Sequence, residues 1–131
     1  MIQEKIRVLI VDDVPQVRQG LTIMLKLISR NITPMIEVIG EAQNGSEAIT
    51  QAQMLQPDVI LMDLEMPGLD GYAATQSIKS ASPSILIIIL SIHGDPASRQ
   101  KVIQAGADAF VEKGAPLEEL IRAIQSFKTT S

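Results

Sequence analysis

The fold is decided by residues 8–13, VLIVDD, and by the matching stretch at residues 59–63, VILMD. In both stretches four apolar residues are followed at once by aspartate. A short apolar run bounded by polar residues predicts a strand that is buried on both faces of a sheet. Two further apolar runs lead to Ser91 and to Lys113. The chain therefore predicts buried strands that carry reactive side chains at their carboxyl ends.

Segments with helical spacing separate these strands, which indicates α/β units around a parallel sheet. A further strand is predicted at residues 36–39, and a turn at residues 66–68. Helix starts are predicted at capping residues, first-turn prolines and one glycine, namely near Pro15, Asn44, Gly71, Asp95 and Pro116. Pro116 is expected within the first turn of the last helix.

Composition favours one domain with a real core. The chain has 131 residues and a mass of 14.2 kDa, and 46% of its residues are hydrophobic. A net charge of −4 and a pI near 4.9 argue against a nucleic-acid surface. There is no cysteine, no signal-peptide pattern and no apolar stretch near the ~20 residues needed to span a bilayer. We expect a cytoplasmic protein in which residues 1–131 form a single domain with its core at about residues 5–127, without an effector domain.

The reactive residues are Asp12, Asp13, Asp63, Ser91 and Lys113. In a parallel sheet the carboxyl ends of the strands share one edge, and ligands bind there. Two carboxylates at ~4 Å repel by roughly 4 kcal/mol at an effective dielectric constant near 20, so the cluster is expected to take up a proton or a cation. Hard oxygen ligands favour Mg²⁺, and an aspartate can accept a phosphoryl group while the lysine and the hydroxyl stabilise it.

Each of these residues taken alone has a simpler structural explanation. Asp12 and Asp13 could cap a turn, Ser91 could be a buried hydroxyl with a local partner, and Lys113 could be solvated. His93 is interpreted as a surface residue. The functional hypothesis is favoured because all these polar residues follow separate apolar strands.

The chain resembles the receiver domain of bacterial two-component response regulators. The matching stretches are residues 8–13, 58–71, 106–108 and 110–113, together with Ser91. Within that family, residues 41–45 and 112–120 resemble the LuxR-type subfamily, whose members carry a helix-turn-helix domain. The resemblance implies a flavodoxin-like three-layer α/β sandwich, with a five-stranded parallel sheet of order 2-1-3-4-5 and five helices.

The resemblance also implies roles for the acidic residues. Asp63 would be the phosphoacceptor. Mg²⁺ would be bound by the side chains of Asp13 and Asp63 and by the backbone carbonyl of Glu65, with Asp12 acting through a metal-bound water.

For the remaining site residues, the resemblance implies a switch. Ser91 and Lys113 would contact the phosphoryl group, and Phe110 would turn inward when Ser91 moves toward it. The surface of the fourth helix, fifth strand and fifth helix would then change and control a transcriptional output domain or a partner. The implied partners are a sensor histidine kinase and a second copy of the chain on phosphorylation, with no membrane. DNA would be bound only through a helix-turn-helix domain outside this chain.

Three alternatives stay open. The chain could be a pseudo-receiver, which is an interaction module that is not phosphorylated. It could be a haloacid-dehalogenase-like phosphatase, although that class needs an acid two residues beyond its nucleophile, where Val14 follows Asp12. A flavodoxin-type electron carrier is disfavoured because Asp12 and Asp13 would repel its phosphate. As a receiver, the protein would catalyse only its own phosphoryl transfer and dephosphorylation.

Overall fold

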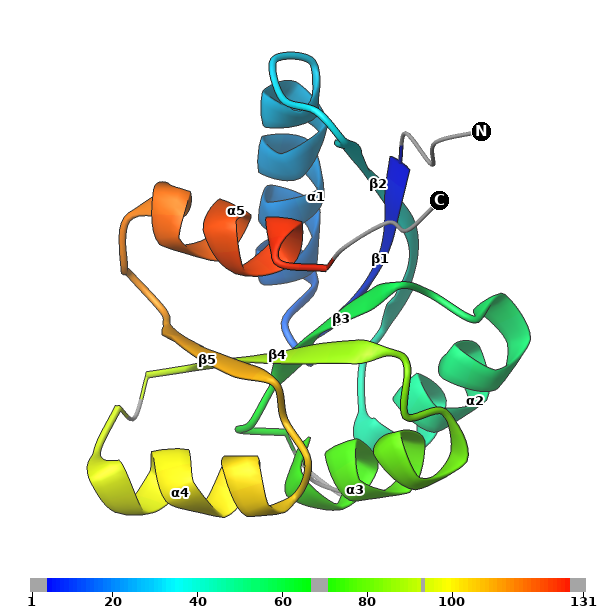
Figure 1. The fold of residues 1–131 in the computed structure, drawn as a ribbon, viewed down its shortest axis with the longest axis vertical. Coiled ribbons are helices and arrows are strands. Elements are labelled where there is room, and N and C mark those ends of the chain that lie inside the picture. Colours follow the sequence, from blue (N-terminus) through cyan, green and yellow to red (C-terminus); the bar gives the residue numbers. More distant parts are fainter. Residues whose placement is uncertain (1–4, 67–70, 93, 128–131) are drawn as a thin grey trace.

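A parallel sheet forms the centre of the protein in this computed structural model, which describes residues 5–66, 71–92 and 94–127. Within these ranges its five strands are β1 Lys5–Val11, β2 Met35–Ala42, β3 Val59–Asp63, β4 Leu86–Ser91 and β5 Ala109–Glu112. They pair in parallel in the order β2-β1-β3-β4-β5 (Figure 1). The predicted fold class and strand order are therefore confirmed.

Helices cover both faces of the sheet. They are α1 Pro15–Ser29, α2 Gly45–Leu55, α3 Gly71–Ala81, α4 Pro96–Gln104 and α5 Leu117–Gln125. α1 and α5 lie on one face, and α2, α3 and α4 lie on the other (Figure 1). None of the helices within the described ranges has both the length and the apolar character needed to cross a bilayer.

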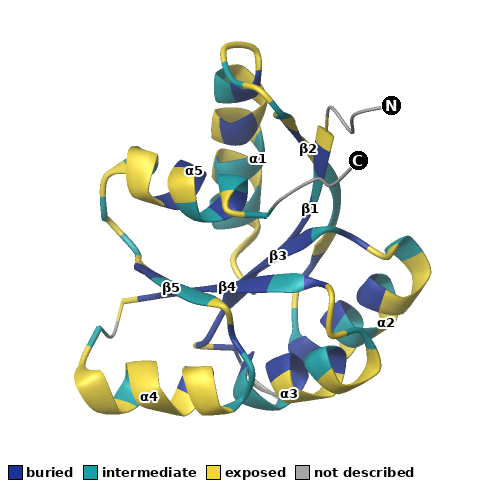
Figure 2. Cartoon of the chain, in the orientation of Figure 1, coloured by how far each residue is buried: buried dark blue, intermediate teal, exposed yellow. Residues whose placement is uncertain are grey.

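Alternate residues of the central strands point into two separate cores. In β3, Ile60 and Met62 pack with α2, α3 and α4, whereas Val59 and Leu61 pack with α1 and α5. All of β3 is buried, and the outer faces of the helices are exposed (Figure 2). This burial on both faces is the reason that the central strands consist of unbroken apolar runs.

Capping residues set the helix boundaries much as predicted. The Asn44 side chain accepts a hydrogen bond of 2.8 Å from the Glu47 amide at the start of α2. Asp95 caps α4 in the same way, with a hydrogen bond of 3.1 Å from the Ser98 amide. Gly106 has a φ of +109° and ends that helix, a conformation that glycine adopts without strain.

Two boundaries differ from the prediction. β2 extends from Met35 to Ala42 instead of over residues 36–39, because Gly40, Glu41 and Ala42 still pair with β1. The charged Glu41 is tolerated there since β2 is an edge strand. Pro116 is the residue before α5 and has extended backbone, so it lies outside the first turn in which it was predicted. The predicted turn at residues 66–68 falls largely outside the described residues, and His93 falls wholly outside them.

Candidate functional site

The carboxyl ends of the central strands bring the predicted residues together. Asp12 and Asp13 follow β1, Asp63 ends β3, Ser91 ends β4 and Lys113 follows β5. Because these strands are neighbours in the sheet, residues up to 101 positions apart in the sequence are in contact. The side chains that end the strands are removed from solvent, with relative exposures of 2% for Asp12, 2% for Asp63 and 0% for Ser91.

Three carboxylates form a cluster that could hold a cation. Asp12, Asp13 and Asp63 each present an oxygen, and these oxygens lie within 4.8 Å of one another. Backbone amides orient two of them, since the Val14 amide donates to Asp12 Oδ1 at 2.9 Å and the Glu65 amide donates to Asp63 Oδ1 at 3.2 Å. Oxygen donors at this spacing fit a hard divalent cation.

Lys113 supplies positive charge to the same cluster. Its Nζ lies 3.1 Å from Asp63 Oδ1 and 3.3 Å from Asp12 Oδ2. Its backbone amide donates to the Ser91 carbonyl at 2.9 Å, which fixes the end of β5 beside the end of β4. The ammonium group therefore bridges two buried carboxylates that would otherwise repel each other.

The electrostatics of the cluster favour uptake of a proton or a cation, as expected. Burial raises the pKa of Asp63 from 3.8 to about 6, against the lowering effect of the Lys113 hydrogen bond, and the Asp12 charge raises it further. Repulsion between carboxylates was the expected cause, but loss of solvent is the larger one. Burial lowers the pKa of Lys113, but its bonds and charge interactions with Asp63 and Asp12 outweigh this, so the pKa lies above its usual value.

Ser91 makes a contact that the sequence analysis missed. Its hydroxyl lies 3.0 and 3.2 Å from the two carboxylate oxygens of Glu65, to which it donates a hydrogen bond. The resemblance had implied a role only for the backbone carbonyl of Glu65. The position of Glu65 two residues after Asp63 was the only sequence feature that could have indicated its side chain.

Phe110 lies at the boundary between core and surface. It is partly buried against the core shared with α2, α3 and α4. The Arg99 guanidinium of α4 lies 4.6 Å from the centre of its ring and 3.3 Å from Glu112. The ring therefore links β5 to α4.

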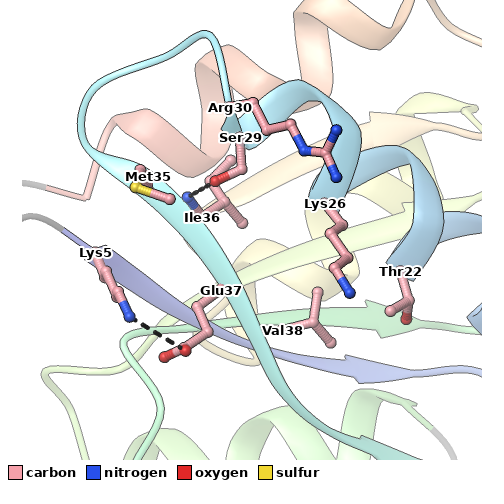
Figure 3. Close-up of a pocket in the computed structure, with 9 residues that line it drawn as sticks. All are labelled: Lys5, Thr22, Lys26, Ser29, Arg30, Met35, Ile36, Glu37 and Val38. Carbon is pink, nitrogen blue, oxygen red and sulfur yellow. Dashed lines mark hydrogen bonds and ion pairs between the residues drawn. The ribbon is translucent and has the colours of Figure 1, made fainter.

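One surface cavity lies away from these residues. It has a volume of about 440 Å³ and opens between α1 and the edge strand β2 (Figure 3). Its lining includes the Lys5–Glu37 ion pair, with a 3.5 Å separation, and the Ser29 hydroxyl, which accepts from the Ile36 amide at 2.9 Å (Figure 3). None of the clustered acids lines it.

A parallel sheet covered by helices, with clustered aspartates, a serine and a lysine at one edge, matches the receiver domain that the resemblance implied. The family model of the response regulator receiver domain matches residues 8–125, and the chain therefore belongs to this family.

Individual relatives point to the LuxR type that the sequence predicted. The chain is 38% identical over 120 residues to the response regulator GacA of Pseudomonas viridiflava, covering 92% of this chain and 54% of the relative. It is 39% identical over 121 residues to the response regulator UvrY of Escherichia coli strain K12, covering 92% and 53%. The chain thus spans about half the length of these curated relatives.

Solved structures agree with this assignment. A LuxR-family response regulator from Aurantimonas sp. SI85-9A1 has a TM-score of 0.82 and 34% identity, covering 92% of this chain and 82% of that one. The receiver domain of the putative response regulator NarL from Mycobacterium tuberculosis has a TM-score of 0.83 and 31% identity, covering 94% and 95%. The predicted family and subfamily are confirmed.

Proposed function

We propose that this chain is a phosphorylation-dependent switch in which Asp63 accepts a phosphoryl group from a sensor histidine kinase. The observation that carries the proposal is the buried cluster of Asp12, Asp13, Asp63 and Lys113 with Ser91 nearby. Residues 1–131 would form one receiver domain. The chain spans about half the length of its curated relatives, which supports a further output domain in the complete protein. A similar solved structure is described as a DNA-binding response regulator of the LuxR family, which supports DNA binding by that domain.

The proposed metal is Mg²⁺. The side chains of Asp13 and Asp63 and the backbone carbonyl of Glu65 would bind it, with Asp12 acting through a metal-bound water. The fit is supported by three carboxylate oxygens that lie within 4.8 Å of one another. When bound, Mg²⁺ would neutralise negative charge on both the acceptor and the phosphoryl oxygens.

In the transfer step, a carboxylate oxygen of Asp63 forms a bond to phosphorus while the bond from phosphorus to the donor imidazole nitrogen breaks. The bonding electron pair leaves with that nitrogen. Lys113 stabilises the charge on the phosphoryl oxygens, and Ser91 donates a hydrogen bond to one of them. Lys113 already lies 3.1 Å from Asp63, so it needs little movement to do this.

The output would be a change of the surface formed by α4, β5 and α5. Ser91 moving toward the phosphoryl group would leave space for Phe110, which packs beneath Arg99 of α4. A hydrogen bond to a charged group contributes about 1.5–3 kcal/mol, whereas conversion from 1:99 to 99:1 needs about 5.5 kcal/mol. Phosphorylation alone therefore gives a mixed population, and dimerisation or a partner would complete the shift.

The direct test is intact-mass spectrometry after incubation with acetyl phosphate and Mg²⁺. The wild-type chain should gain one phosphoryl group, and Asp63→Asn should gain none. Asp95→Asn is the matched control, because asparagine also caps a helix, and it should be labelled like wild type. Labelling of Asp63→Asn would show that the acceptor assignment is wrong, and absence of label on the wild type would favour the pseudo-receiver.

A further inference from the structure

The carboxylate of Glu65 is bound to the end of β4. Its Oε1 accepts from the Ser91 hydroxyl at 3.0 Å and from the Ile92 amide at 3.3 Å, and its Oε2 lies 3.2 Å from the same hydroxyl. We refer to this arrangement as the Glu65 contact. The same residue reaches the acceptor through its backbone, since its amide donates to Asp63 Oδ1 at 3.2 Å. Glu65 therefore links the proposed phosphoacceptor to the proposed switch hydroxyl.

A serine hydroxyl has one hydrogen to donate. In this structure that hydrogen is directed to the Glu65 carboxylate, a charged acceptor that makes a stronger bond than a neutral one. Ser91 cannot donate the same hydrogen to a phosphoryl oxygen on Asp63. A hydrogen bond from Ser91 to a phosphoryl oxygen therefore requires the bond from Ser91 to Glu65 to break. The negative charge of Glu65 also opposes a dianionic group nearby.

We propose that the Glu65 side chain holds Ser91 in the unphosphorylated arrangement and thereby weakens binding of a phosphoryl group at Asp63. Glu65 is a positioning residue here, acting through Ser91. The inference rests on the proposed function, because it assumes that Ser91 donates to the phosphoryl group. Release is feasible since Glu65 is an exposed residue, so its carboxylate can move into water while Ser91 stays buried.

The first test examines the contact itself in the metal-free protein. In an NMR spectrum, Glu65→Ala should shift the amide resonances of Ser91 and Ile92, and the Ile92 amide should exchange faster with solvent. Glu118→Gln, which changes an exposed acid in the first turn of α5, should leave both resonances unchanged. Unchanged Ser91 and Ile92 resonances in Glu65→Ala would overturn the proposal without reference to phosphorylation.

The second test measures the affinity for beryllofluoride, a phosphoryl analogue, at saturating Mg²⁺. Glu65→Ala should bind roughly 10- to 150-fold more tightly than wild type, the range expected for loss of one charged hydrogen bond. Glu65→Gln keeps an acceptor oxygen without the charge, so its gain should be smaller. Glu118→Gln should bind like wild type.

A Ser91→Ala background separates this contact from simple charge repulsion. If Glu65 acts through the hydroxyl, Glu65→Ala should have a much smaller effect once that hydroxyl is absent. An equal effect in both backgrounds would overturn the proposal in favour of charge repulsion alone. Wild-type binding that Glu65→Ala leaves unchanged would also overturn it, whereas a wild-type chain that binds no beryllofluoride would overturn the proposed function as well.

Discussion

At the scale of single residues, Asp63 is the most perturbed group of the cluster. Its side chain is buried, and its pKa of about 6 means that the metal-free protein holds a partly protonated carboxyl near neutrality. Lys113 is the cation that makes this burial tolerable, because its ammonium lies within 3.3 Å of both Asp12 and Asp63. Burial therefore disfavours the ionised form of Asp63 in the metal-free protein.

This cluster predicts a pH-dependent gain in stability for Asp63→Asn. The folded-state pKa of about 6 lies above the unfolded value of 3.8, so the folded chain binds more protons between these values. The free energy of unfolding must therefore fall as the pH rises through that window. Asp63→Asn should add about 1–3 kcal/mol at neutral pH and almost nothing below about pH 4.

Urea unfolding of wild type and Asp63→Asn in EDTA, at neutral pH and below about pH 4, measures this gain. Asp95→Asn should show no comparable pH-dependent increase, since Asp95 lies in an exposed helix cap. Equal or lower stability of Asp63→Asn at neutral pH would mean that the ionised carboxylate is not a cost to the fold.

At the scale of secondary structure elements, the start of α3 fits closely against the end of β3. A Cβ atom added to Gly71 would lie 2.6 Å from the backbone carbonyl oxygen of Asp63 and 3.0 Å from the Cα of Leu64. Neither backbone atom can move without shifting the end of the strand that presents Asp63. A glycine is required here for close approach between two elements.

Gly71→Ala should therefore destabilise the chain by about 1–3 kcal/mol, the usual cost of overpacking, and should weaken Mg²⁺ binding. Gly20→Ala is the matched control, since it lies in the middle of α1 with no atom within 4 Å of the added methyl. It should stabilise by about 0.5–1 kcal/mol because alanine is the better helix former. Denaturant unfolding compares the two, and equal effects would contradict the proposed packing constraint.

At the scale of the whole molecule, two cores lie on opposite faces of one sheet. The acid cluster lies at the edge of that sheet where the carboxyl ends of the strands come together. A cation that binds the cluster only in the folded chain must stabilise the entire domain. The net charge of −4 adds a general attraction for cations, so any test has to be made at constant ionic strength.

Mg²⁺ at 100 times its dissociation constant should raise the free energy of unfolding by about 2.7 kcal/mol, which corresponds to an increase in Tm of roughly 10 °C for a domain of this size. A thermal melt with and without Mg²⁺, at matched ionic strength, measures the shift. Asp13→Asn should lose most of it. A shift of the same size in Asp13→Asn would show that the ion binds elsewhere.

Much of this organisation could be predicted from the sequence. The unbroken apolar runs before Asp12 and Asp63 predicted strands buried on both faces, and the cap at Asn44 was predicted from local residue types. The predicted bounds of β2 and the predicted position of Pro116 were wrong. They depend on strand pairing and on the backbone path into α5, not on local composition. The convergence of Asp12, Asp63 and Lys113 was predicted because parallel strands end at a common edge.

By itself, the sequence determined the succession of strands and helices along the chain, the burial of the central strands on both faces and the residues that end each strand. These follow from periodicity and from the geometry of a parallel sheet. Only the tertiary structure decided which groups those side chains contact. The bond from Ser91 to Glu65, the ammonium of Lys113 between two carboxylates and the Arg99 guanidinium over Phe110 depend on side-chain conformations across separate elements. The degree of burial that raises the pKa of Asp63 likewise arises only when the strands pack together.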